Sequence, residues 1–211
     1  WAFSLFSPQN SFLISSQKCS ALFTSRIAMN TVSSPATVPT REGSSMPSIA
    51  ELAAEGVPVV AVDADLTGST TTKKLADAGY AGRLFNCGIA EQNMIDVAAG
   101  LALTGHVAYT GSFAVFGTGR AYDQIRNTVC YSNLDVKICP THAGVSVGPD
   151  GGSHQMLEDV SLMRGLPNMR VLVPADYAAA RAAIKLAAKT PGPVYCLLYT
   201  SPSPRDTERS R

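Results

Sequence analysis

Short apolar runs alternate with segments of helical spacing along the middle of the chain. The apolar runs cover residues 57–62, 83–86, 107–110, 136–139, 170–173 and 194–198. Between them, apolar residues recur at helical spacing over 90–103, 121–130, 155–164 and 177–189. Strands this short and apolar, separated by helices, indicate a mostly parallel, twisted sheet with helices on both faces. We therefore expect a single three-layer α/β domain.

Three further features add detail to this picture. Gly105 follows a predicted helix where the chain must reverse, and Asp176 precedes another helix as a side chain that can cap it. In parallel sheets, ligands bind beyond the carboxyl ends of the strands. The polar residues that follow the first, third and fourth apolar runs are Asp63, Asp65, Ser112, Thr141 and His142. They favour a site at that edge of the sheet.

Composition and charge exclude several classes of protein. Of 211 residues, 45% are hydrophobic, which is enough for a core, and 17 Lys and Arg balance 16 Asp and Glu. This balance favours neither nucleic acid nor an anionic membrane as a partner. No apolar run approaches the roughly 20 residues of a spanning helix. The five cysteines lack CxxC spacing, which argues against a disulfide framework or a structural zinc site. We expect a reducing compartment, the cytoplasm.

The two ends of the chain differ from its middle. No acidic residue precedes Glu42, whereas Lys18, Arg26 and Arg41 are basic. Residues 1–40 are therefore a disordered leader, a stretch read from the untranslated region of the message, or a transit peptide for a plastid or mitochondrion. Residues 200–211 are polar and lack an apolar anchor, which predicts a disordered, non-native tail. The folded domain is expected over 41–199.

Two small groups of residues allow both a structural and a functional interpretation. Glu91 falls in the first turn of a helix, where the macrodipole favours any carboxylate, but a carboxyl group there can also serve chemistry. Phe113 and Phe116, three residues apart after a strand, are either core residues or one wall of a pocket for a flat heterocycle.

A Gly-rich loop over 142–152 carries a third group. His142, Asp150 and nearby His154 can donate hydrogen bonds and shuttle a proton. Their spacing fits no regular metal site, and we expect no metal to be bound by this chain. Nucleotide-loop and hydrolase motifs are absent from the sequence. Each group alone therefore leaves the function open.

Together, these segments resemble a known family. Residues 64–69 (Ala-Asp-Leu-Thr-Gly-Ser), 88–94 (Gly-Ile-Ala-Glu-Gln-Asn-Met), 113–116 and 141–155 are similar, in order and spacing, to the pyrimidine-binding domain of transketolase-type thiamine diphosphate enzymes. The resemblance covers 41–198. It implies the thiamine diphosphate-binding fold of the pyrimidine-module type. It also implies transfer of a two-carbon ketol unit between sugar phosphates, as in the pentose phosphate pathway.

The resemblance assigns roles to individual residues. Glu91 matches the catalytic glutamate, whose carboxyl group hydrogen-bonds the cofactor's aminopyrimidine ring and stabilises the imino tautomer that deprotonates the thiazolium carbon. This chemistry requires a carboxyl group in a dry environment. Phe113 and Phe116 match the aromatic residues that hold the pyrimidine, and Asp65 matches an aspartate beside the thiazolium. These four residues are the predicted cofactor-binding set.

Other residues match the family's substrate-binding positions. His142 and His154, which are also predicted to be catalytic, match residues that contact the sugar's carbonyl and hydroxyl groups, as does Asp150. Arg41 and Ser69 match residues that bind the substrate phosphate. Buried polar groups of this kind select hydroxyl-bearing substrates, because an analogue that lacks the hydroxyl leaves them unpaired.

The chain departs from the family pattern at three places. Gly119 stands where a third aromatic residue, Tyr, is usual, and Pro149 stands where Glu is common. The last strand runs into Leu-Tyr-Thr (198–200) instead of a phrase such as Leu-Ser-Arg. These departures put one wall of the pocket and one phosphate contact in doubt.

The family's diphosphate-binding domain, with its Gly-Asp-Gly…Asn metal motif, is absent from this sequence. We therefore expect a partner domain or subunit that binds Mg²⁺ and the diphosphate, in a homodimer or heterotetramer, and no activity of this chain alone. The chain is then a split subunit or a fragment. The alternatives are a 1-deoxyxylulose-5-phosphate synthase or 2-oxo acid dehydrogenase β-type domain, or a non-catalytic scaffold. Thr141-His142 favours transketolase, because the synthase typically has Asp-Arg.

Overall fold

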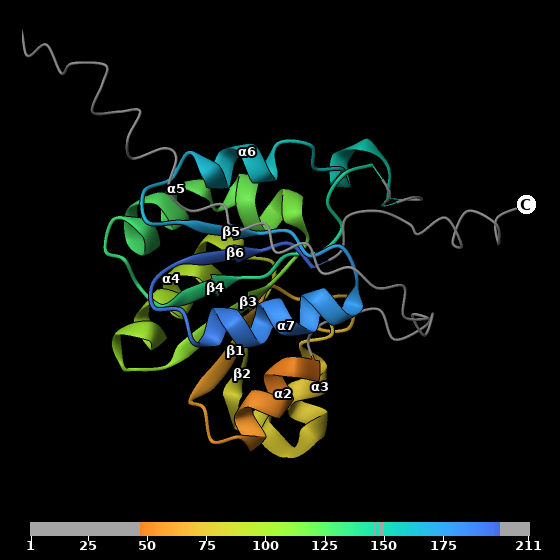
Figure 1. Ribbon diagram of the computed structural model, residues 1–211. Helices are drawn as coiled ribbons and strands as arrows, with labels where there is room; N and C mark the ends of the chain where they lie inside the picture. The colour runs from red at the N-terminus through yellow and green to blue at the C-terminus, as the bar shows by residue number, and fades with distance from the viewer. Residues whose placement is uncertain (1–46, 146, 148–149, 199–211) are drawn as a thin grey trace, which may run out of the picture. The chain divides into compact units, whose positions relative to one another are not determined.

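A six-stranded, entirely parallel sheet forms the centre of the computed structural model, which describes residues 47–145, 147 and 150–198 (Figure 1). The strand order is β2-β1-β3-β4-β6-β5. The strands are β1 (Val59–Asp63), β2 (Leu84–Asn86), β3 (Val107–Gly111), β4 (Val136–Ile138), β5 (Arg170–Leu172) and β6 (Val194–Cys196). The predicted parallel α/β sheet is confirmed.

Helices connect the strands. Before the second strand come α2 (Pro47–Ala54), α3 (Lys73–Leu75), η1 (Ala76–Tyr80) and η2 (Ala81–Arg83). The middle of the chain contains α4 (Glu91–Leu103), η3 (Val115–Arg120), α5 (Tyr122–Gln124) and η4 (Ile125–Cys130). After the fourth strand come η6 (Gly152–His154), α6 (Asp159–Arg164) and α7 (Tyr177–Ala188).

Both faces of the sheet are covered, as the apolar runs predict. On one face, Val60 and Val62 of β1 pack in a core with side chains of α4, η4 and α6. On the other face, Val59 and Ala61 pack in a core with side chains of α2, α3 and α7, including Ile184. Figure 1 shows α7 and α2 on one side of the sheet and α6 on the other. Burying a large apolar side chain stabilises the fold by roughly 1.5–3 kcal/mol, so two-sided burial explains the continuous apolar strands.

Two predicted helix boundaries are confirmed. Gly105 has φ 87°, a conformation that glycine adopts without strain, and it follows α4. Asp176 caps α7 because its side chain accepts a 2.7 Å hydrogen bond from the Ala179 N–H. The helices α2 and η3 were not predicted from the sequence.

The helix predicted over 155–164 is wrong at its beginning. It begins only at Asp159, because Met156 is held extended against Gly144. The Gly144 N–H donates to Met156 O at 2.6 Å, and the Met156 N–H donates to Gly144 O at 3.1 Å. The Met156 side chain is buried in the core, so tertiary packing overrides the helical spacing of this segment.

Several expectations lie outside the described residues: the leader at 1–40, the substrate residue Arg41, the substitution Pro149 and the tail at 200–211. The proposed domain boundaries and the cellular compartment likewise stay predictions. In the described part of the chain, no helix combines the length and apolar character needed to cross a bilayer.

Candidate active site

The ends of β3 and β4 are joined by main-chain hydrogen bonds beyond the regular sheet. The Thr141 N–H donates to Ser112 O at 3.1 Å, and the Ala114 N–H donates to Thr141 O at 2.8 Å. These bonds hold the two loops side by side where the strands end. They bring Phe113 and His142 to the carboxyl edge of the sheet, where parallel α/β proteins bind ligands.

Four rings gather at this edge and form what we call the ring cluster: Phe113, Phe116, His142 and His154. The ring centroid of Phe113 lies 4.2 Å from that of His142, 6.3 Å from that of Phe116 and 6.4 Å from that of His154. The His154 ring meets Phe116 edge-on at 5.1 Å. The two loops thus place two benzene faces and two imidazoles around one location, although His154 is 41 residues after Phe113 in the sequence.

His142 is oriented by its own backbone and by its neighbours. Its φ is 59°, an uncommon conformation for a residue with a side chain, and its Nδ1 lies 2.7 Å from the Thr141 hydroxyl. Burial lowers the pKa of His142, and the negative charge of Asp150 partly opposes this shift. The neutral imidazole is therefore favoured, which suits a group that accepts a proton or a hydrogen bond from a ligand.

Glu91 begins α4 and is buried, with 2% of its side chain exposed. The turn before it, which is held by hydrogen bonds to the Asn86 side chain, positions Glu91. The Asn86 Oδ1 accepts hydrogen bonds from the Gly88 N–H at 2.9 Å and the Asp65 N–H at 3.1 Å. Gly88 has φ 67°, so the turn needs glycine at this position. The sequence placed Glu91 in the first helical turn, and its burial now argues against a merely dipole-favoured surface carboxylate.

An arginine that sequence reasoning missed joins Glu91 to the ring cluster. The Arg120 Nη1 donates to Glu91 Oε2 at 2.9 Å, and the Arg120 guanidinium carbon lies 4.5 Å from the centroid of the Phe116 ring. Arg120 ends η3, a π-helix, and stands four residues after Phe116, about one turn away. The four-residue spacing alone brings the two residues together only if the segment is helical, and a helix was not predicted there.

Three other predicted residues lie at the same edge but are less closely joined to the rings. Asp65 has φ 63°, is exposed, and binds Asn86 through its main chain. Ser69 is exposed in the loop between β1 and α3, and within the described residues it has no hydrogen bond with the ring cluster. Asp150 is exposed and acts on His142 through its charge. Their roles stay predictions.

Asp63, at the end of β1, forms a buried network. Its Oδ2 accepts hydrogen bonds from the Thr70 hydroxyl at 2.7 Å and the Thr72 hydroxyl at 2.8 Å, and its Oδ1 accepts one from the Leu66 N–H at 2.6 Å. Burial raises the pKa of Asp63 despite these donors. The network holds the 64–72 loop at the end of β1. The Asp63 side chain therefore has a structural role, whereas Asp65 is exposed and bonds through its main chain.

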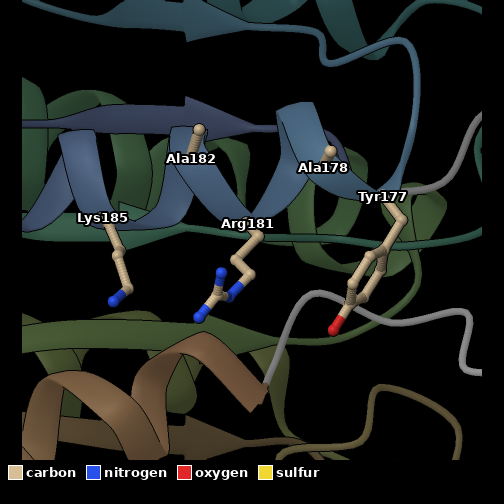
Figure 2. A pocket seen from close by; sticks show the side chains of 5 residues that line it. All are labelled: Tyr177, Ala178, Arg181, Ala182 and Lys185. Atoms are coloured by element: carbon tan, nitrogen blue, oxygen red, sulfur yellow. The ribbon is translucent and has the colours of Figure 1, made fainter. Parts of the chain in front are cut away.

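A shallow hollow of about 330 Å³ lies elsewhere, along α7 (Figure 2). Its lining consists of Tyr177, Ala178, Arg181, Ala182 and Lys185. The two cationic side chains point toward α2: Arg181 pairs with Glu51 of that helix at 2.6 Å, and Lys185 pairs with Glu55, the residue that follows it, at 2.9 Å. Because these charges are paired and the lining shares no residue with the ring cluster, the hollow is not a catalytic candidate.

The residues at the sheet edge fit the pyrimidine half of thiamine diphosphate. A carboxylate and stacked aromatic faces suit a flat, nitrogen-containing ring. The buried Ser112 Oγ, next to Phe113, has no hydrogen-bond partner within the described residues, which is unusual for a native interior and leaves the hydroxyl available to a ligand. Among the described residues, no cluster of His, Cys, Asp and Glu could hold a metal ion. The fit is to the ring of the cofactor.

Known proteins resemble this chain in both sequence and structure. Residues 37–202 match the family model "Transketolase, pyrimidine binding domain". A Methanocaldococcus jannaschii protein, named provisionally as a transketolase C-terminal section, is 50% identical over 150 residues, covering 71% of this chain and 46% of that protein. The Homo sapiens transketolase is 38% identical over 144 residues, covering 68% of this chain and 22% of the enzyme.

The structural comparison agrees. A solved structure titled "Split gene transketolase, inactive beta4 tetramer" is 49% identical, with a TM-score of 0.66, covering 76% of this chain and 51% of that one. The predicted thiamine diphosphate-binding fold is thereby confirmed. The chain spans less than half the length of the curated relatives just named. By sequence and by fold, it belongs to the transketolase family and comprises that family's pyrimidine-binding domain.

Proposed function

We propose that this chain is the pyrimidine-binding half of a transketolase that transfers a two-carbon ketol unit between sugar phosphates. In this proposal it works only with a diphosphate-binding domain or subunit, which holds Mg²⁺ and the diphosphate of thiamine diphosphate. Family membership supports the chemistry. The names of the split-gene and C-terminal-section relatives support the division of the enzyme into two chains.

The observation that carries the proposal is the placement of Glu91. A carboxyl group with 2% exposure lies at the head of α4 and is linked through Arg120 to Phe116 of the ring cluster. Burying a carboxylate is costly unless it has a partner or a ligand, and the partner of this one, Arg120, lies over an aromatic ring expected to hold a pyrimidine. Bound thiamine diphosphate supplies the carbanion chemistry of the reaction. Glu91 holds a proton at the ring nitrogen, and Phe113 and Phe116 fix the plane of the ring.

The remaining polar groups serve the sugar in this proposal. His142, neutral at pH 7, accepts a hydrogen bond or a proton from a substrate hydroxyl, and Asp150 tunes it by charge. His154 lies edge-on against Phe116 and contacts the sugar in this proposal. Arg41 and Ser69 bind the substrate phosphate.

Reconstitution tests the division of labour. The purified full chain is assayed for ketol transfer with thiamine diphosphate and Mg²⁺, alone and with a separately expressed diphosphate-binding chain of a split transketolase. We expect no activity alone and activity in the mixture. Activity of the chain alone would overturn the requirement for a partner.

A matched pair of variants separates a catalyst from a scaffold. In the reconstituted complex, Glu91→Gln is expected to lower kcat by a factor on the order of 10² or more, because it removes the carboxyl group that handles the proton. Glu55→Gln, at an exposed position in the turn directly after α2, keeps full activity. If Glu91→Gln leaves kcat unchanged while assembly is normal, the chain is a non-catalytic scaffold.

A further inference from the structure

Arg120 touches both groups that an aminopyrimidine ring would need. Its guanidinium donates a 2.9 Å hydrogen bond to Glu91 and lies 4.5 Å from the centroid of the Phe116 ring. A guanidinium is flat, carries N–H donors along one edge and stacks on aromatic faces. An aminopyrimidine is also flat and stacks on aromatic faces, and its ring nitrogen pairs with a carboxyl group through the proton that the two share. The arginine thus occupies, with the same chemistry, the contacts that the proposed function assigns to the cofactor's ring.

The burial of the two partners is unequal. The Glu91 side chain is 2% exposed, whereas that of Arg120 is 48% exposed. The carboxylate is therefore fixed in the protein, while the arginine reaches it from the solvent side and can leave without opening the core. Within the described residues, the Glu91 carboxylate accepts its hydrogen bond from Arg120. Its departure would leave a buried charge in need of another donor.

The same segment controls both the arginine and the rings. Arg120 ends η3, and Phe116 lies one turn before it, so the backbone positions of the cation and of the aromatic ring are set by the same short π-helix. Thr118, between them, is buried, and its hydroxyl donates to Ala114 O at 2.5 Å. The segment is thus fixed at its centre, and the side chain of Arg120 is the part free to swing.

We propose that Arg120 is a competitive latch for the pyrimidine site: its guanidinium and the cofactor's aminopyrimidine ring exchange for Glu91 and the face of Phe116. This inference rests on the proposed function and adds a regulatory step to it. Until a ring displaces it, Arg120 donates a hydrogen bond to the buried Glu91 carboxylate and so offsets the cost of its burial. Because the ring must first displace Arg120 from Glu91 and Phe116, the affinity for the ring is lower than it would be without this arginine.

The probe for the test is the hydroxymethyl aminopyrimidine that forms one half of thiamine, added to the full chain without a partner. Arg120 side-chain protons near the Phe116 ring have NMR resonances displaced by its ring current, and these resonances are identified by their loss in Arg120→Met. We expect the probe to shift Phe113 and Phe116 signals and to return the Arg120 signals to their ordinary positions. The measurement is made on the unmodified chain, and the variant serves only to identify the resonances.

Affinity provides the second measurement. The probe must displace both the half-exposed ion pair and the cation–π contact, which hold Arg120 in place with similar, modest free energies. Arg120→Met should therefore bind the probe about fivefold more tightly than the unmodified chain. The gain should vanish in a Glu91→Gln background, where the carboxylate charge is gone. Arg181→Met is the matched control, because it removes a surface arginine–glutamate pair on α7 and should leave affinity unchanged.

The outcomes distinguish the latch from the function it depends on. If the probe binds but the Arg120 signals do not move, or Arg120→Met binds no more tightly, the latch is wrong and the pyrimidine site stands. If the probe perturbs none of the rings in the unmodified chain, Arg120→Met or the control, both the site and the latch are wrong.

Discussion

The rings of Phe113 and His142 lie 4.2 Å apart at an interplanar angle of 38°, although they belong to loops that follow different strands. Phe113 shields the imidazole from water, and shielding disfavours its charged form. The contact therefore links the geometry of the two strand ends to the protonation of the site. Its consequences can be measured directly.

Burial lowers the pKa of His142 below 6.5, so its imidazole is neutral at pH 7. We expect Phe113→Ala to raise this pKa toward its ordinary value by admitting water, and Asp150→Asn to lower it further by removing the charge that favours protonation. NMR titration of the His142 ring protons measures both shifts. A lower pKa in Phe113→Ala would contradict the shielding argument.

The same shift gives a sign for stability. Because the folded-state pKa of His142 lies below its unfolded value, the unfolded chain takes up a proton first as the pH falls. This group should therefore reduce the free energy of unfolding as the pH falls from about 6.5 through the folded-state pKa, and contribute nothing above that window. Denaturant unfolding of His142→Gln should show a weaker pH dependence there than the unmodified chain does.

Gly111, the last residue of β3, has no room for a side chain. A Cβ at this position would lie 2.7 Å from Thr72 Cγ2 and 2.8 Å from Asp63 Oδ2. Gly111→Ala should lower the free energy of unfolding by about 1–3 kcal/mol, because the 64–72 loop must move. Gly100→Ala is the control: it lies within α4 with nothing in reach of its Cβ and should raise stability by about 0.5–1 kcal/mol. Equal effects of the two variants would contradict the packing argument.

The buried carboxyl group of Asp63 predicts an opposite pH dependence. Its folded-state pKa lies above the ordinary 3.8, so the unfolded chain ionises first as the pH rises. Its contribution to stability is complete below that value and is lost as the pH rises through the folded-state pKa. Asp63→Asn, whose amide can still pair with Thr70 and Thr72, should lack this loss. Urea unfolding from pH 4 upward measures the difference, which should grow with pH.

Two buried tyrosines provide a matched comparison. The Tyr195 hydroxyl donates to the buried Asp159 carboxylate, whereas the Tyr109 hydroxyl donates to the neutral Ile184 carbonyl. Burial raises the pKa of both tyrosines far above the usual value. Tyr195→Phe should cost roughly 1.5–3 kcal/mol and Tyr109→Phe about 1 kcal/mol, because a carboxylate loses more than a carbonyl does. Chemical denaturation ranks the two, and the reverse order would contradict the argument.

The sequence was most informative where local chemistry determines structure. The apolar runs set the strands because side chains at successive positions are buried on both faces, and Gly105 and Asp176 mark helix ends by backbone conformation and capping. Parallel strands end at one edge, so placing Phe113 and His142 together followed from the strand assignment. These inferences needed only periodicity and the rule for strand ends.

The sequence was least informative where a contact depends on the winding of a short segment. The Arg120–Glu91 pair joins residues 29 positions apart and requires η3 to be a π-helix, for which the sequence shows no clear signal. Met156 has the spacing of a helix, but its side chain is drawn into the core from an extended segment. The helix α2 was within reach, since Ile49, Leu52 and Ala53 lie on one buried face.

The order of the strands also bears on how the chain is made. β6, the last strand of the described residues, lies between β4 and β5, so among those residues β5 has no neighbouring strand until Cys196 has been synthesised. Until then, the ribosome-bound chain exposes an unpaired edge of β4 and the apolar side chains of β5. Such edges recruit other strands. During translation, this incomplete sheet is therefore the stage at which the chain is most exposed to pairing with other strands.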